Sequence, residues 1–226
     1  TSSDGVGLYG CWGGTPFPIP ENGYEAMWNH LLTYTSPGET NSVGYLVNAN
    51  RATTMLLLSR SIADYPYFNP QQTPYEGAGI YYLRSLSTTL EPAREAGTQT
   101  LLWYPLHYDS DEQRAWSYQA GQRRVRLAPE FAYDTPVAQF GGAMFFDEIN
   151  LFAGRMDRFR FELKGRKLMY MPYNNYRMHL LRGDPAQLLG PHHFHPDKVR
   201  YELRRVWVVE ATPLPNVRHV AKRKLF

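Results

Sequence analysis

The stretch Asp157-Arg-Phe-Arg-Phe-Glu-Leu-Lys-Gly-Arg-Lys-Leu-Met-Tyr-Met-Pro-Tyr173 decides the fold class of this chain. In its first half, apolar and charged residues alternate, so Phe159, Phe161 and Leu163 fall on one face of an extended strand. A period of two with one charged face is typical of an antiparallel sheet that is covered on one side. Lys164-Gly-Arg-Lys167 predicts a turn, after which the apolar residues return as a second strand. The whole stretch is therefore predicted to be a hairpin.

Similar patterns along the chain predict more antiparallel strands. We expect them at residues 43–49, 52–60, 80–90, 98–106, 115–119, 123–127, 200–212 and 217–226, with a proline-rich loop at 64–79. Residues 143–152 are expected to form a short helix or an edge segment. These elements predict a mainly β fold: a curled antiparallel sheet, or open half-barrel, with one or two helices packed on its concave face, as a single domain over residues 1–226.

One helix is predicted clearly, from Gly23 to Thr33. Asn22 can cap its first turn, and Glu25 follows at the spacing of a capping box. Its apolar residues recur at helical spacing and are expected to lie against the sheet: Tyr24, Met27, Trp28 and Leu31.

Composition limits the classes of function. The net charge of +3 argues against a dedicated nucleic-acid-binding protein but is compatible with an anionic lipid surface. Aromatic residues make up 15% of the chain, and tyrosine, which suits half-buried sheet faces and ligand grooves, leads with 17. The single cysteine, Cys11, excludes an internal disulfide. The chain shows no apolar run long enough to span a bilayer and no export signal, so any such signal is expected to lie outside it.

Several phrases of the sequence resemble a known family. They are Gly10-Cys-Trp-Gly-Gly-Thr-Pro-Phe-Pro-Ile-Pro20, Glu25-Ala-Met-Trp-Asn-His-Leu31, Gly121-Gln-Arg-Arg-Val-Arg126, Ala132-Tyr-Asp-Thr-Pro136, Met171-Pro-Tyr-Asn174 and Tyr201-Glu-Leu-Arg-Arg-Val-Trp-Val-Val-Glu-Ala211. Together they resemble the proteobacterial family known as domain of unknown function 1329, over nearly the whole chain. The resemblance provides no catalytic residues that could be carried over.

The resemblance implies a fold and a setting. The family is similar to the periplasmic lipoprotein carriers of the LolA and LolB type, which have an unclosed antiparallel barrel around a hydrophobic cavity. It implies an exported protein, periplasmic or associated with the outer membrane, and partners such as a resistance-nodulation-division lipid exporter or an outer-membrane protein. It also implies that this chain is a segment of a longer protein.

The candidate ligand-binding residues are aromatic. They lie on the predicted strands and on the helix: Trp28, Trp103, Trp116, Tyr118, Phe159, Phe161, Tyr170 and Trp207. One interpretation is that they line a groove for an acyl chain or a similar apolar ligand, because such pockets are mostly apolar. The other interpretation is that they form the core beneath the helix.

The candidate contacts for anionic headgroups are arginines on two predicted strands: Arg124, Arg126, Arg204 and Arg205. Guanidinium groups bind phosphate well, and a basic surface favours peripheral contact with a membrane. The alternative is a solvated strand face with glutamates as cross-strand partners.

Two motifs suggest chemistry without defining it. His192-His-Phe-His195 lies between prolines and is the best candidate for a metal site, although a surface loop explains it as well. Asp147, Glu148 and Asp157 are candidates for the two carboxylates of a glycan-active hydrolase. We predict no catalytic residue, metal or cofactor.

The function expected is a non-catalytic carrier or binding protein for a lipid or another hydrophobic molecule. Two alternatives stay open, namely a glycan-active hydrolase of the cell envelope and a structural component of an envelope assembly. An apolar cavity between helix and sheet would favour the carrier. Two carboxylates facing each other across an open cleft would favour the hydrolase.

Overall fold

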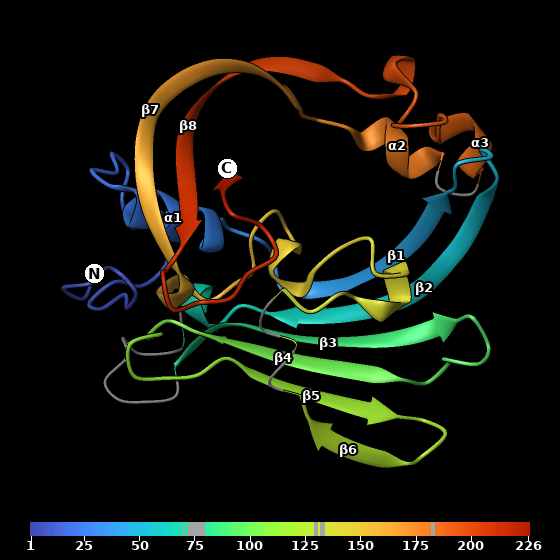
Figure 1. The fold of residues 1–226 in the computed structure, drawn as a ribbon, viewed down its shortest axis with the longest axis horizontal. Helices are drawn as coiled ribbons and strands as arrows, with labels where there is room; N and C mark the ends of the chain where they lie inside the picture. The colour runs from blue at the N-terminus through green and yellow to red at the C-terminus, as the bar shows by residue number, and fades with distance from the viewer. Residues whose placement is uncertain (70, 72–79, 129–130, 132–133, 182–183) are drawn as a thin grey trace.

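The described strands form two antiparallel sheets joined by one core (Figure 1). The computed structural model describes residues 1–69, 71, 80–128, 131, 134–181 and 184–226. The first sheet contains, in order, β1 (Gly38–Val47), β2 (Thr53–Asp64), β3 (Tyr81–Glu91), β4 (Gln99–Pro105), β5 (Arg114–Gln119) and β6 (Arg124–Leu127). The second contains β7 (Phe159–Pro172), β8 (Tyr201–Pro213) and β9 (Lys224–Leu225). The helices are α1 (Gly23–Leu31), α2 (Tyr176–Leu180) and α3 (Pro185–Leu188).

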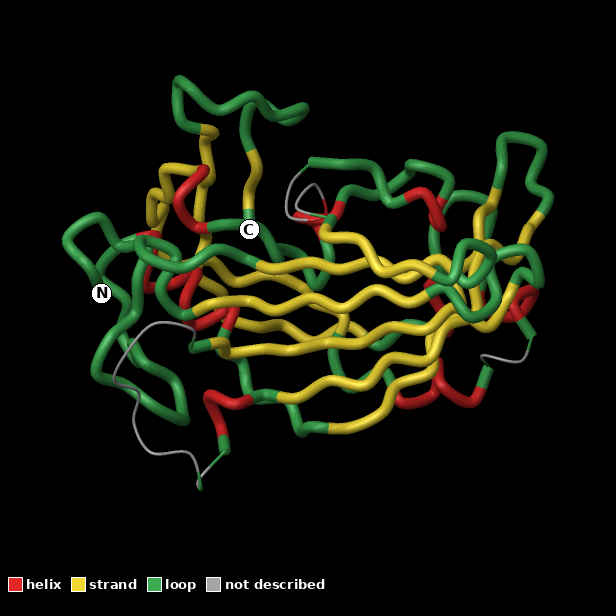
Figure 2. The backbone as a smooth tube through the Cα atoms, turned by 90° about the horizontal axis from the view of Figure 1, so that it is seen from below, coloured by secondary structure: helices red, strands yellow, loops and turns green. Residues whose placement is uncertain are grey.

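The mainly β, antiparallel fold with few helices is confirmed. The six strands of the first sheet pair in sequence order. Figure 2 shows its strands lying side by side, and a turn after Val47 joins β1 to β2. The expectation of a single sheet is wrong, because the irregular segment between β6 and β7 interrupts the ladder. Within it, residues 146–148 form a 3₁₀ turn. Most of the loop expected at 64–79 lies outside the described residues.

The predicted hairpin at 157–173 is wrong. β7 runs as one strand from Phe159 to Pro172 and pairs with β8 along its whole length. At Lys164-Gly165, where a turn was predicted, the register shifts by one residue and forms a β-bulge. Gly165 has a φ of +100°, a region that glycine adopts readily, so the chain bends there without reversing.

Replacement of Gly165 by alanine is expected to destabilise the protein by about 1–2 kcal/mol, because a Cβ is disfavoured at positive φ. No atom lies within 4 Å of the position of that Cβ, so backbone conformation alone is tested. Urea unfolding of the variant measures the loss. Gly38→Ala is the control. A Cβ at Gly38 also meets no atom within 4 Å, but the φ angle of Gly38 is not positive. Equal stability of the two variants would contradict the bulge.

The two faces of the six-stranded sheet differ in composition. The face towards the segment 131–146 carries small polar residues that are buried: Ser59, Thr89, Thr98 and Ser117. The opposite, outer face carries the larger apolar side chains that the register brings together: Leu101, Trp103, Trp116, Tyr118, Val125 and Leu127. The aromatic face expected to be covered is therefore the uncovered face of this sheet.

The hydrophobic core lies where α1 meets the second sheet and the ends of β3 and β4. It also receives the N-terminal segment, because Leu8 N–H donates to the carbonyl of Leu106. The core consists of Val6, Leu8, Met27, Trp28, Leu32, Tyr67, Tyr82, Tyr104, Leu106, Tyr108, Phe152, Ala153, Met156, Phe159, Phe161, Val209 and Ala211. This cluster fixes α1 against β7 and β8, and the candidate site lies beside it.

Candidate ligand-binding site

An apolar cavity of about 660 Å³ lies between α1, the β7–β8 ribbon and the C-terminal residues. Its volume falls within the range of small-molecule binding sites. It is lined by Ala26, Met27, His30, Leu151, Lys167, Met169, Met171, Val206, Trp207, Val208, Val209, Leu225 and Phe226. We call it the ribbon cavity.

The ribbon presents one of its faces to this cavity. β7 contributes Lys167, Met169 and Met171, which alternate along the strand and so share a face. Lys167 is the cross-strand partner of Val206 on β8, which also lines the cavity. Methionine side chains are flexible and polarizable, and they adapt to apolar ligands of differing shape.

α1 forms the opposite wall. The side chain of Asn22 accepts a hydrogen bond from Glu25 N–H at 3.0 Å, as the capping pattern predicts, and the helix ends at Leu31. Gly23 permits close approach to β7, because a Cβ there would lie 2.5 Å from the carbonyl carbon of Phe161. His30 is hydrogen-bonded to the carbonyl of Asn150, and burial lowers the pKa of its imidazole. This favours the uncharged ring beside the apolar lining.

The C-terminal residues close one side of the cavity. β9 pairs with Glu210 and Ala211 of β8, and Phe226 exchanges two backbone hydrogen bonds of 2.9 Å with Val209. The phenyl ring of Phe226 contacts that of Phe152 edge-on. The last residues therefore lie beside β8, as Figure 1 shows.

A buried ionic cluster holds this C-terminal segment in place. The carboxylate Oδ2 of Asp147 accepts from His219 Nε2 at 2.7 Å and from Lys224 Nζ at 3.0 Å. On the other side of the ring, Ala221 N–H donates to His219 Nδ1 at 2.9 Å. All three side chains are at least nine-tenths buried. The cluster connects the segment between the two sheets to the strand that carries Leu225.

The predicted aromatic set is divided among three places. Trp28, Phe159 and Phe161 belong to the core. Trp28 is fully buried, and its indole N–H donates to the carbonyl of Gly5 at 3.0 Å. These three residues therefore lie in the core, which was the second interpretation of the aromatic set.

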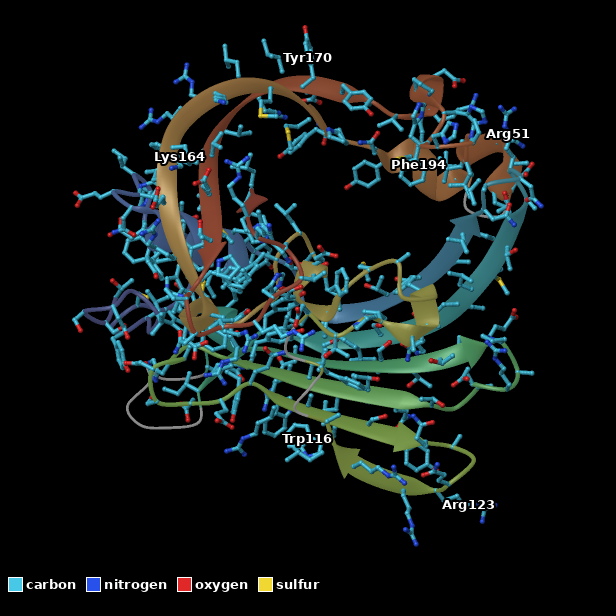
Figure 3. All side chains as sticks on the ribbon, in the orientation of Figure 1. Arg51, Trp116, Arg123, Lys164, Tyr170 and Phe194 are labelled. Carbon is cyan, nitrogen blue, oxygen red and sulfur yellow. The ribbon has the colours of Figure 1, made fainter. Side chains whose placement is uncertain are left out.

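Trp103, Trp116 and Tyr118 lie on the outer face of the six-stranded sheet and are partly exposed. The rings of Trp103 and Trp116 meet edge-on at 5.1 Å. In Figure 3 Trp116 and Tyr170 lie on opposite sides of the molecule. The structure therefore does not bring this trio to the ribbon cavity.

Tyr170 and Trp207 belong to the ribbon. Tyr170 is exposed and points outward, whereas Trp207 is half-buried and is the one predicted residue that borders the ribbon cavity. The guanidinium of Arg166 lies 4.1 Å from the centre of the Trp207 ring. The residues from Val206 to Val208 are half-buried, and the cavity lies beside them.

The four candidate arginines are also dispersed. Arg124 and Arg126 are exposed on β6, and Arg126 donates to the side chain of Gln122 at 2.7 Å. Arg204 is paired with Glu202 and stacks on the ring of Tyr173. Arg205 is exposed, and no ion pair is found for it among the described residues.

The carboxylates named for a hydrolase are engaged with other groups. Asp147 is in the buried cluster, Glu148 accepts from Phe145 N–H, and Asp157 is paired with Arg155. This is not the pair of carboxylates across an open cleft that a glycosidase requires. Within the described part of the chain, no group of three or more metal-ligating side chains could hold an ion, and no helix is long and apolar enough to cross a membrane.

Several residues of the cavity wall were missed by the prediction. Met169 and Met171 were assigned to the return strand of a hairpin, so the face they share was not assigned to a ligand. Their spacing of two is a signal that could have identified them. Leu151 and Phe226 lie outside the strands β7 and β8, and no local pattern reports such contacts.

The cavity and the two sheets define a β-rich protein with an open apolar site, and comparison with known proteins places it in a family. The chain belongs to the family of proteins of unknown function DUF1329, whose pattern it matches over residues 1–226. It is 32% identical, over 224 residues, to the uncharacterized protein PA3922 of Pseudomonas aeruginosa. That match covers 98% of this chain and 49% of the relative, so the chain spans about half of the relative's length.

Two solved structures are similar. A DUF1329 family protein from Desulfovibrio piger aligns with a TM-score of 0.52 and 13% identity, over 90% of this chain and 65% of its own. A domain described as an outer membrane lipoprotein-sorting protein domain, from Vibrio parahaemolyticus, aligns with a TM-score of 0.48 and 14% identity, over 89% and 63%. The first likeness supports the fold.

Proposed function

We propose that this protein is a non-catalytic carrier or binding protein that holds a lipid or another apolar molecule in the ribbon cavity. The observation that carries the proposal is the cavity itself, about 660 Å³ with an almost entirely apolar lining, between helix and sheet. Burial of an acyl chain contributes about 0.8 kcal/mol per methylene group, so such a site binds without elaborate polar chemistry. In this proposal, the β7–β8 ribbon and α1 serve as the half-barrel-like container expected from the sequence.

The ligand class that fits best is an amphiphile with an acidic end. Lys167 is the one lysine or arginine among the described lining residues, and no ion pair within the described chain occupies it. A carboxylate or phosphate at Lys167 would leave the chain of the ligand against Met169, Met171 and Met27. A fatty acid is therefore expected to bind more tightly than the alcohol of equal length.

The setting we propose is the periplasm or the outer membrane, which the family resemblance implies. A lipid exporter or an outer-membrane protein is the partner that such a carrier requires. The proposed setting and the proposed partner both depend on the carrier role.

A matched pair of substitutions tests the proposal. Met169→Gln places an amide of nearly equal length in the cavity, and the polar group is expected to weaken binding of a fluorescent fatty acid about tenfold. Leu168→Gln makes a similar change at the adjacent position, whose side chain lies on the other face of the ribbon, and is expected to change affinity less than about twofold.

Fluorescence titration without vesicles, below the concentration at which the fatty acid forms micelles, measures both affinities. Circular dichroism establishes that both variants are folded. Failure of the unmodified protein to bind any chain length, or equal loss in both variants, would remove the ribbon cavity as the site.

A further inference from the structure

The outer face of the β7–β8 ribbon forms a second distinctive surface. The register pairs Leu168 with Arg205, Tyr170 with Leu203, and Pro172 with Tyr201. Because paired residues project to the same side of a sheet, these side chains share one face, opposite the ribbon cavity. We call it the outer ribbon face: Arg166, Leu168, Tyr170, Pro172, Tyr201, Leu203 and Arg205.

This face exposes large apolar side chains. The exposed fractions are 63% for Leu168, 72% for Tyr170, 55% for Leu203 and 52% for Tyr201. Figure 3 shows Tyr170 pointing away from the rest of the molecule. A contiguous group of such residues marks an interaction surface, whereas isolated ones do not.

The charges on this face have one sign. Arg166 and Arg205 lie among the apolar residues, and none of the residues of the outer ribbon face is acidic. Glu202 lies on the cavity side, since it pairs with Met171, and it is neutralised by Arg200 and Arg204. The face therefore combines leucine and tyrosine with uncompensated positive charge.

We propose that the outer ribbon face docks on a lipid bilayer that carries anionic headgroups. Tyrosine favours the interfacial region of a membrane, where an apolar ring and a polar tip are both accommodated. Leu168 and Leu203 enter the acyl boundary, and Arg166 and Arg205 contact lipid phosphates. A face without carboxylates suits a negatively charged surface. This docking surface does not depend on ligand binding in the cavity.

A fluorescent label at two matched positions tests the proposal. With Cys11 replaced by serine, Leu168→Cys and Leu127→Cys each provide one thiol for an environment-sensitive dye. Leu127, on the outer face of β6, is 63% exposed, the same fraction as Leu168. With vesicles of phosphatidylcholine and phosphatidylglycerol, the label at position 168 is expected to shift to shorter wavelength and to be quenched by spin-labelled lipid, and that at 127 to remain in water.

Two further variants test separately how charge and apolar contact contribute to vesicle binding. Arg166→Gln with Arg205→Gln is expected to lower partitioning onto these vesicles about 30-fold, since each cation near an anionic surface contributes about 1 kcal/mol. Tyr170→Ser with Leu203→Ser is expected to abolish flotation with the vesicles. Both variants replace exposed residues, and thermal melts establish that they fold.

Three results would overturn the proposal. One is an unchanged label at 168 with anionic vesicles, and another is an equal response at 127. The third is a concentration-dependent dimer that disappears in the Tyr170→Ser, Leu203→Ser variant, which would assign the face to a second copy of the chain. Binding to vesicles by a Met169→Gln protein that has lost its fatty acid would show that the two surfaces act separately.

Discussion

Replacement of Asp147 by alanine is expected to lower the free energy of unfolding by about 3–5 kcal/mol, because it leaves the buried Lys224 ammonium with only the more distant, partly exposed carboxylate of Glu148. His219 loses the acceptor of its Nε2 proton in the same step. The segment that carries Leu225 and Phe226 is held by this cluster, so the wall of the ribbon cavity is expected to loosen as well. Urea unfolding, followed by tryptophan fluorescence, measures the loss.

Glu148→Ala is the matched control for Asp147. Glu148 is adjacent in sequence and lies 3.7 Å from the same Lys224 nitrogen, but its side chain is 39% exposed. The Glu148→Ala substitution is expected to lower the free energy of unfolding by no more than about 1 kcal/mol. In Asp147→Ala combined with Lys224→Met, part of the stability should return, because the uncompensated charge is removed. Equal effects of the two single substitutions would show that the cluster does not hold the C-terminal segment.

Replacement of Trp28 by alanine is expected to cost about 3–5 kcal/mol, the range for a large core side chain. Trp28 is fully buried, contacts the rings of Tyr82 and Tyr108, and donates to Gly5. It joins α1 to β3 of the first sheet and to the N-terminal segment, so its loss affects the centre of the core. Equilibrium unfolding by guanidinium chloride, monitored by circular dichroism, measures the effect.

Trp116→Ala is the control for Trp28. Both tryptophans belong to the predicted ligand-binding set, yet Trp116 lies on the outer face of β5, where its main contact is an edge-on ring contact with Trp103. Such a contact contributes about 0.5–1.5 kcal/mol, so a loss near 1 kcal/mol is expected. If Trp28→Ala were no more destabilising than Trp116→Ala, the division of the aromatic residues between core and surface would be wrong.

Local patterns predicted most of the strands. Alternation and turn residues identify a strand pair when the pair is consecutive in the chain, as for β1–β2, β3–β4 and β5–β6. The capping residues of α1 identify its first turn, because they too are local in the chain. The ribbon β7–β8 was missed as a pair because the segment 173–200 separates its strands. Gly165 lies at a bulge in β7. Glycine is typical of both bulges and turns, so the sequence predicted a turn at this position.

The sequence predicted the kind of candidate site, an apolar groove, but not its position in the fold. Aromatic residues on alternate positions indicate a face that is covered or binds a ligand, but the pattern does not say which of several faces it is. Trp103 and Phe161 show equivalent patterns, and only the tertiary fold places the first on an outer face and the second in the core. The cavity also depends on Leu151 and Phe226, whose contacts are set by the ionic cluster around Asp147.

The positions of the methionines allow the most direct test of the central claim, that the ribbon cavity holds an apolar ligand. The chain has seven methionines. Met27, Met169 and Met171 line the cavity, whereas Met55, Met144, Met156 and Met178 are not among its lining residues. Methyl-labelled methionine gives one nuclear magnetic resonance signal for each, and a fatty acid with a spin label on its chain broadens those near it. We expect broadening of the signals of Met27, Met169 and Met171 alone at stoichiometric ligand. Broadening centred on Met55 or Met144, or none at saturating ligand, would contradict the account.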